Sequence, residues 1–302
     1  MPITQVEAKK RLAELSSQGG GIISGAVKSE IEPNSRILVI GLGGLGCKTV
    51  NELAGVYRND FNDQGRLSWI AVDTDKSCFD RISSLNGGNI EQRDMFSLYR
   101  KDVQNLLKHP RTPYVRSFVH DEVPPYPITD QGAQQRRIVG KVMLCGGSVY
   151  GELRTEIKRR IEAMGGAANG SGMQVIIVAG ISGGTGSGTF IDVSYMVREL
   201  ANENANNSVF GIFYTPDVQR NEPWCTEAIW DNLQRNGYAS MKELDYFMSV
   251  GDSGNGGRVV YSLPLNREID INGVLVNKLD SKLPIFGREY VFMISETDTN
   301  KR

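Results

Sequence analysis

Two glycine-rich segments of the sequence have the composition of phosphate-binding loops. The first, Gly41–Gly46 (GLGGLG), fits the spacing G-x-G-x-x-G. The second, Gly183–Gly188 (GGTGSG), places the hydroxyl donors Thr185 and Ser187 between glycines. Glycine lets a backbone turn tightly and bring its N–H groups close to an anion, and a helix that starts there adds the positive end of its dipole. Both segments therefore predict contacts with phosphate.

Each segment lies between a predicted strand and a predicted helix. The apolar run RILVI begins at Arg36 and leads into the first segment, and CKTVNELAGVY follows it with helical spacing. The run MQVIIVAG leads into the second segment, and a helix is predicted from about Phe190 to Ala205. Further predicted strands are LSWIAVDTD, SVFGIFYTP, RVVYSL and EYVFMIS, and residues 224–249 predict a long helix. This alternation predicts an α/β fold with a mostly parallel, twisted sheet flanked by helices.

We expect the nucleotide-binding domain at residues 36–302, with an extension before it and an irregular insert within it. Residues 1–35 form an N-terminal extension, with an amphipathic helix at 5–15 and a Gly/Ser loop after it. Residues 86–135 are rich in Asn, Gly, Pro and charge and predict an irregular insert, in which 95–109 has room for a helix. Residues 136–164 predict a helix that is broken near Cys145.

Composition excludes several classes of protein. The 302 residues hold 34 Lys plus Arg and 35 Asp plus Glu, so the net charge of −1 argues against nucleic-acid binding by bulk charge. The four cysteines form no C-x-x-C pair and there are two histidines, so we expect no zinc site, no disulfide framework and a reducing cytoplasm. No signal peptide and no run of 18 apolar residues occurs, so we expect no membrane span.

The first segment alone leaves the nucleotide open. A Rossmann dehydrogenase would use an acidic residue after the second strand, where Asp73 and Asp75 lie. The string ILVIGLGGLGCKTVNELA also resembles adenylating enzymes of the ThiF/MoeB type, but their C-x-x-C pairs are missing. No Gly-Lys-Ser/Thr follows the second segment, which is therefore not a Walker A loop. Two glycine segments are not explained by a dinucleotide fold, which uses one.

The second segment resembles the signature of the tubulin/FtsZ superfamily, G-G-G-T-G-[ST]-G. Residues Ser182–Gly188 (SGGTGSG) depart from it only at the first position, where Ser replaces Gly. Other stretches resemble further loops of the family in the family's order. They are GLGGLGCKTVNEL with Asn51, AVDTD with Asp73, Thr74 and Asp75, DQGAQQRR with Gly132 and Ala133, FYTPD with Pro216 and Asp217, and RNGYASMKELDYF with Asn236.

The stretches GAQQRRIVGKVML and NGYASMKELDYF are most similar to the bacterial tubulin-like branch, and the resemblance covers about 36–295. It implies GTP or GDP with Mg²⁺ at the carboxyl ends of the strands, a cytoplasmic bacterial protein, and a homo-oligomer or head-to-tail filament. The nucleotide-binding residues that it implies are Gly41, Gly43, Gly44, Gly46, Cys47, Asn51, Asp73, Asp75, Gly132, Ala133, Gly183, Gly184, Thr185, Gly186, Ser187, Gly188, Pro216 and Asn236.

The end of the sequence departs from the family pattern. In the family, an acidic residue of one subunit reaches the γ-phosphate held by the next, whereas no such catalytic loop and no activation-type domain is found here. Glu268, Asp270 and Asp280 are interpreted as solvated carboxylates. We therefore expect GTP binding with weak hydrolysis in this chain alone and assign no catalytic residue. The alternatives are an ATP- or NAD-using enzyme of ThiF or Rossmann type and a GTP-gated adaptor that does not polymerise.

Overall fold

The computed structural model describes most of the predicted domain. The described residues are 36–60, 66–84, 87–109, 115, 118–119, 132–164, 172–201, 208–248, 286 and 291–295. The predicted N-terminal extension, the strand RVVYSL and the three carboxylates Glu268, Asp270 and Asp280 lie outside this part of the chain.

Within the described residues, six parallel strands form one sheet in the order β3-β2-β1-β4-β5-β6. Their bounds are β1 Arg36–Leu42, β2 Leu67–Asp73, β3 Met95–Ser97, β4 Met173–Gly180, β5 Ser208–Tyr214 and β6 Val291–Ile294. The central strands are apolar on both faces because helices cover both faces. The prediction of an α/β fold with a mostly parallel sheet is confirmed.

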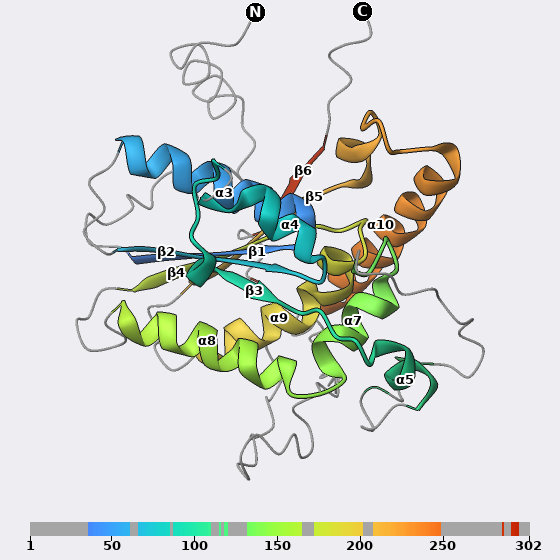
Figure 1. The fold of residues 1–302 in the computed structure, drawn as a ribbon, viewed down its shortest axis with the longest axis horizontal. Coiled ribbons are helices and arrows are strands. Elements are labelled where there is room, and N and C mark those ends of the chain that lie inside the picture. Colours follow the sequence, from blue (N-terminus) through green and yellow to red (C-terminus); the bar gives the residue numbers. More distant parts are fainter. Residues whose placement is uncertain are drawn as a thin grey trace, which may run out of the picture. The chain divides into compact units, whose positions relative to one another are not determined.

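Helices cover the two faces of the sheet (Figure 1). On one face lie α3 Gly43–Asp60 and α4 Lys76–Ile82, and on the other lie α7 Arg137–Cys145, α8 Val149–Ala163, α9 Thr185–Ala201 and α10 Glu227–Met248. The shorter elements are η2 Gln92–Asp94, α5 Val103–Lys108 and η4 Pro216–Gln219. Within the described residues, no helix has the length and apolar character needed to cross a membrane.

Alternate residues of each central strand enter different core clusters. Leu38 and Ile40 of β1 belong to the larger cluster, under α7, α8 and α9, whereas Val39 belongs to the smaller cluster, under α3 and α4. This division follows from the period of two of a β-strand. This alternation fixes the register of the strands, and the register determines where each strand ends along the edge of the sheet.

The structure differs from the sequence-based expectations at three places. The segment 86–135, expected to be irregular, contains the edge strand β3, which pairs with the end of β2. Its three residues are too few to show a periodicity. The helix expected from about Phe190 begins at Thr185, and β1 runs to Leu42 so that α3 begins at Gly43. Residues 43–46 and 185–188 of the two glycine segments therefore form first turns of helices, because close packing offsets the low helix propensity of glycine.

A buried arginine joins α8 to the edge of the sheet. The side chain of Arg160 is 7% exposed and forms ion pairs with Asp94 of η2 at 3.0 Å and with Glu156 at 2.7 Å. It also donates to the backbone carbonyls of Trp69 and Arg93. One guanidinium thus links α8, β2 and η2, using the planar set of donors that only arginine has.

The ion pairs of Glu156 predict that the stability of the fold depends on pH. Hydrogen bonds from Arg159 and Arg160 lower the pKa of the Glu156 carboxyl. A lowered pKa stabilises the fold above the pKa of the unfolded chain, and this stabilisation is lost as pH falls through the folded pKa. We expect wild type to be more stable to urea than Glu156→Gln at pH 7, and the difference to shrink toward pH 3. Glu162→Gln, on an exposed turn of α8, serves as the control, and a difference independent of pH would contradict the assignment.

Candidate functional site

Both glycine segments begin helices at the carboxyl edge of the sheet. Strands β1 and β4 are neighbours; β1 leads directly into α3, and β4 leads into α9 after four residues. Because α3 and α9 cover opposite faces (Figure 1), the chain turns in opposite directions after two adjacent strands. Such a switch point is where open α/β sheets bind ligands. The candidate site is therefore the edge between β1 and β4.

The backbones of the two segments meet at this edge. Gly43 has a φ of +71°, and a Cβ there would lie 2.8 Å from the amide nitrogen of Gly186. A Cβ at Gly186 would lie 2.5 Å from the carbonyl oxygen of Gly180. Only glycine permits this approach. It brings the first turns of α3 and α9 side by side, with their unpaired N–H groups at one place.

Two glycines of the segments face open space. A Cβ at Gly44 or at Gly183 would have no atom within 4 Å. Gly44 lies in the first turn of α3, and Gly183 lies just before α9. A ligand therefore has access to the backbone at both helix starts, which is the arrangement that binds phosphate groups.

The other predicted glycines are packed against backbone or side chains. In the first segment, a Cβ at Gly41 would lie 2.3 Å from the carbonyl oxygen of Gly46, and a Cβ at Gly46 would lie 2.4 Å from that of Val178. In the second segment, a Cβ at Gly184 would lie 2.8 Å from Cβ of Ala133, and a Cβ at Gly188 would lie 2.3 Å from the carbonyl oxygen of Arg137. Ser187 donates its hydroxyl to the carbonyl of Gly183. These residues shape the two helix starts, and a direct contact with a ligand stays a prediction for each.

A buried carboxylate organises the floor of the site. Asp73 ends β2 and is 4% exposed. Its Oδ1 accepts from the backbone N–H groups of Thr74 at 2.7 Å and Asp75 at 3.2 Å, and from the Thr185 hydroxyl at 2.8 Å. Burial raises the pKa of the Asp73 carboxyl, although these hydrogen bonds act in the opposite direction. The carboxylate thus holds the end of β2 to the start of α9.

A chain of hydroxyl groups extends this contact to a third segment. The Thr74 and Thr185 hydroxyls lie 2.6 Å apart, and Thr74 is the donor because Thr185 gives its proton to Asp73. The Thr74 hydroxyl in turn accepts from the backbone N–H of Ala133 at 3.0 Å. A Cβ at Gly132, whose φ is +68°, would lie 2.6 Å from the Thr74 hydroxyl. The predicted residues 132 and 133 are therefore in contact with the strand ends.

Helix α10 is joined to the site through one asparagine. The side-chain nitrogen of Asn236 donates to the carbonyls of Gln135 at 2.7 Å and Ser182 at 2.9 Å. A Cβ at Gly237, the next residue, would lie 2.3 Å from Cγ of Pro216. Asn236 and Pro216, which are far apart in the sequence, thus lie at the same edge as the glycine segments.

Three predicted residues are engaged elsewhere. Asn51 lies two turns into α3, where its side-chain oxygen accepts from the N–H of Asn89 at 2.7 Å. Asp75 caps the start of α4 by accepting from the N–H of Ser77 at 2.9 Å. Cys47 belongs to α3, and its side chain is completely buried. The structure does not bring these side chains into the open part of the site, and their contact with a ligand stays a prediction.

The sequence-based interpretation missed two residues that position α7 against α9. Arg137 donates to the carbonyl of Ser187 at 3.3 and 3.2 Å and pairs with Glu243 of α10. A Cβ at Gly140 would lie 2.4 Å from Gly184 O. An arginine at a helix start does not indicate by its position which carbonyl it will contact, and a single glycine within a helix gives no local signal of close packing.

The Thr185 hydroxyl is expected to stabilise the protein in the absence of any ligand. Thr185→Val keeps the shape but removes the donor to Asp73 and the acceptor for Thr74, so we expect a loss of about 1–3 kcal/mol in the free energy of unfolding. Urea unfolding without nucleotide measures it, with Thr185→Ser as the control that keeps the hydroxyl. Equal midpoints for Thr185→Val and wild type would contradict the inferred bonds.

Comparisons with known proteins give a family and several similar folds. A family model described as "tubulin like" matches residues 38–299. A search of curated proteins finds no match.

Three solved structures illustrate the similarity. The GTPγS-form protofilament of TubZ from Bacillus thuringiensis serovar israelensis is 18% identical with a TM-score of 0.45, and the match covers 72% of this chain and 44% of that one. GDP-bound CetZ1 from Haloferax volcanii is 15% identical with a TM-score of 0.41, over 68% and 47% of the two chains. The empty FtsZ dimer from M. jannaschii is 16% identical with a TM-score of 0.39, over 80% and 47%. The match spans less than half the length of each of these structures.

Proposed function

The chain belongs to the tubulin-like family, whose model matches residues 38–299, and from this premise we propose that it binds GTP and assembles head to tail into filaments. In this proposal residues 36–302 are the nucleotide-binding domain, the protein acts in the bacterial cytoplasm, and GTP hydrolysis is completed only across a subunit interface. Hydrolysis is weak in the separate chain because phosphoryl transfer depends on charges and a positioned water that the neighbouring subunit supplies.

The observation that carries the proposal is the pair of open glycines at the switch point. Gly44 and Gly183 expose the backbone at the starts of α3 and α9, and both helix dipoles present their positive ends there. A triphosphate carries several charges and suits two adjacent helix starts better than one. A dinucleotide enzyme of Rossmann type would use the start of α3 alone and leave the arrangement around Thr185 without a role.

Asn236 is proposed to face the base. Its amide nitrogen is already engaged with the carbonyls of Gln135 and Ser182, so its oxygen is the group that remains to accept a hydrogen bond. An acceptor suits the N–H donors on the Watson–Crick edge of guanine. The preference for guanine itself follows from membership of the family.

Magnesium is proposed to accompany the phosphates. The ion prefers oxygen ligands and keeps several waters, and when bound it neutralises phosphate charge. Asp75 is the carboxylate we assign to its water shell, because it lies two residues after the end of β2 with its side chain 23% exposed and can reach the ion through water while it still accepts from Ser77. Asp73 is already held by three donors and is assigned to the protein's own structure.

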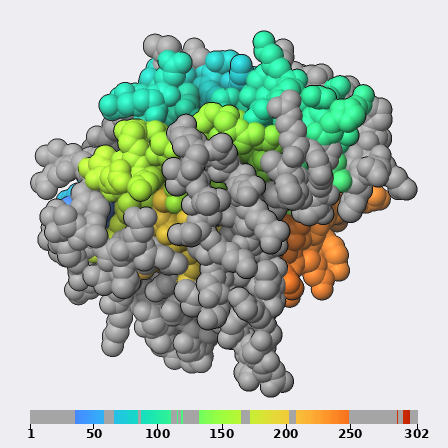
Figure 2. Space-filling view, turned by 90° about the horizontal axis from the view of Figure 1, so that it is seen from below, coloured from blue at the N-terminus to red at the C-terminus, as the bar shows by residue number. Residues whose placement is uncertain are grey.

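The surface of α10 supports assembly. Beside Asn236, this helix exposes Tyr238 at 67%, and Met241 and Tyr246 at 48% each, and α10 is at the surface in Figure 2 (orange). Large apolar side chains gathered on one exposed helix are typical of a surface that another protein covers. A head-to-tail contact joins different surfaces, so it does not close and it produces filaments.

The first test identifies the nucleotide. The purified chain is denatured and the released nucleotide is separated by chromatography; if none is present, GTP, ATP and NAD are titrated with Mg²⁺. We expect guanine nucleotide, bound at least about tenfold more tightly than ATP or NAD, which corresponds to about 1.4 kcal/mol. A preference for ATP or NAD would overturn the proposal and favour the adenylating or dehydrogenase class.

Sedimentation with GTP separates a filament from an adaptor. We expect pelleting that requires GTP and Mg²⁺ and that is reduced in Tyr238→Ser, a change on the exposed face of α10. Selective GTP binding without pelleting at any protein concentration would instead support a GTP-gated adaptor.

A further inference from the structure

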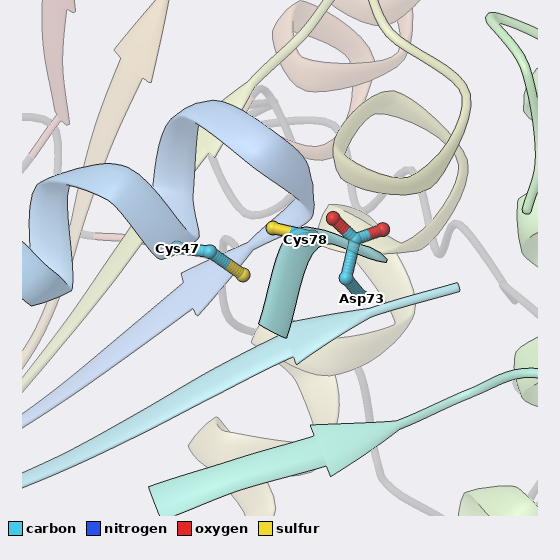
Figure 3. Close-up of side chains that lie close together, drawn as sticks. All are labelled: Cys47, Asp73 and Cys78. Carbon is cyan, nitrogen blue, oxygen red and sulfur yellow. The ribbon is translucent and has the colours of Figure 1, made fainter. Parts of the chain in front are cut away.

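Three side chains of the kinds that bind metal ions, two cysteines and one aspartate, lie together beneath the candidate site. The Sγ atoms of Cys47 and Cys78 and a carboxylate oxygen of Asp73 all lie within 4.8 Å of one another. Cys47 comes from α3, Asp73 from the end of β2 and Cys78 from α4. Figure 3 shows the two thiols extending toward each other, with the carboxylate beside Cys78. Neither thiol faces the open part of the candidate site, because both side chains are buried.

The spacing suits a tetrahedral metal ion. Zinc binds thiolate sulfur at about 2.3 Å and carboxylate oxygen at about 2.0–2.2 Å, so its ligands lie roughly 3.5–3.8 Å apart. Atoms within 4.8 Å of one another therefore need to move by about 1 Å at most to reach that spacing. The carbonyl oxygens of Gly41 and Val72, at 3.8 and 3.6 Å from the Cys47 sulfur, are further oxygen atoms beside the cluster.

The surroundings hold the carboxylate in place. Oδ1 of Asp73 accepts the three hydrogen bonds from Thr74, Asp75 and Thr185. Such bonds orient a metal-binding carboxylate and favour its ionised form. The same carboxylate lies within 4.8 Å of both sulfur atoms, so it contacts the start of α9 through Thr185 and lies beside the thiols as well.

A metal site explains this cluster better than a redox pair does. Cys47 is 0% exposed and Cys78 is 3% exposed. An oxidant must reach a thiol to form a disulfide, and the burial of both side chains opposes this. A metal ion, in contrast, displaces the thiol protons itself and is retained by burial.

We propose that Cys47, Cys78 and Asp73 bind one thiophilic divalent cation such as zinc. The ion would form a structural site that links α3 and α4 to the end of β2. Two thiol protons are released to solvent as the ion enters. Two thiolates, one carboxylate and one doubly charged ion then carry a net charge of −1, the same as two thiols and one carboxylate. This balance lets the ion enter the core without adding buried charge.

Cobalt is the probe for the test. The full chain is reduced, stripped of metal and titrated with Co²⁺, which produces charge-transfer absorption when thiolates bind it. We expect one Co²⁺ per chain, displaced by Zn²⁺, and an affinity that is at least about tenfold lower in Cys47→Ser and in Cys78→Ser. Cys225→Ser, which changes the partly exposed cysteine outside the cluster, should bind as wild type does.

A second measurement needs no variant. At a urea concentration at which the metal-free wild type is alkylated at Cys47 and Cys78, Zn²⁺ should protect these two cysteines, and not Cys225, as read by mass spectrometry of peptides. The proposal is overturned if wild type shows no charge-transfer band, if the band survives in both variants, or if Zn²⁺ leaves the alkylation of the two cysteines unchanged. A Cys47–Cys78 disulfide in protein purified without reductant would overturn it in favour of a redox pair. None of these readouts depends on nucleotide binding.

Discussion

Replacing Gly183 with valine is expected to abolish nucleotide binding and to leave the fold intact. A Cβ at this position would have no atom within 4 Å, so the first carbon of the added side chain meets no other part of the protein. The added methyl groups would occupy the space at the start of α9 that we assign to phosphate. We expect GTP affinity to fall at least about 100-fold, which corresponds to about 2.7 kcal/mol. The unfolding free energy should change by no more than about 0.5 kcal/mol.

Gly186→Ala is the matched change within the same segment. Its Cβ would lie 2.5 Å from the carbonyl oxygen of Gly180, so the backbones of β4 and α9 must separate. We expect this variant to lose stability by about 1–3 kcal/mol, as overpacked cores do. Fluorescence titration with a labelled GTP analogue and urea unfolding measure both variants. A Gly183→Val protein that binds GTP as wild type does would remove the start of α9 from the binding site.

Replacing Arg160 with methionine is expected to destabilise the fold by about 3–5 kcal/mol. Methionine fills a similar volume but has no donors, so the Asp94 carboxylate, 12% exposed, loses its ion-pair partner. The carbonyls of Trp69 and Arg93 lose the same donor. Removing one member of a buried ion pair is costly because the remaining charge stays out of water.

Arg160→Lys separates charge from geometry. Lysine keeps the positive charge but offers no planar set of donors, so it cannot reach two carboxylates and two carbonyls together. We expect Arg160→Lys to lose less unfolding free energy than Arg160→Met, as measured by urea unfolding at neutral pH. A change of less than about 1 kcal/mol for Arg160→Met would place this arginine among surface ion pairs, which contribute little.

Local sequence was sufficient for the main features of the fold. Apolar runs of strand type preceded each glycine segment, and helical spacing followed it, which predicted the succession of β1, α3, β4 and α9. The carboxyl ends of parallel strands share one edge of a sheet. Placing Asp73, Gly132 and Gly183 near one another therefore needed only the order of the elements and the family resemblance.

The finer boundaries were not predictable in this way. The strand β3 has three residues, too few to show a period. The early start of α9 is opposed by the low helix propensity of glycine and is set by contacts with β4 and α7. In both cases the deciding interactions lie between residues far apart in the sequence.

The roles of individual residues were decided by the tertiary structure alone. Sequence made Gly183 and Gly186 look equivalent, yet one faces open space and the other is packed against a carbonyl. Spacing argued against a metal site, yet the fold brings Cys47 and Cys78 to one carboxylate. Sequence determined which chemical groups end at the carboxyl edge of the sheet, because strand and helix periodicity is local. Which of those groups face a ligand, and which hold the protein together, depends on the atoms that the fold places opposite each of them.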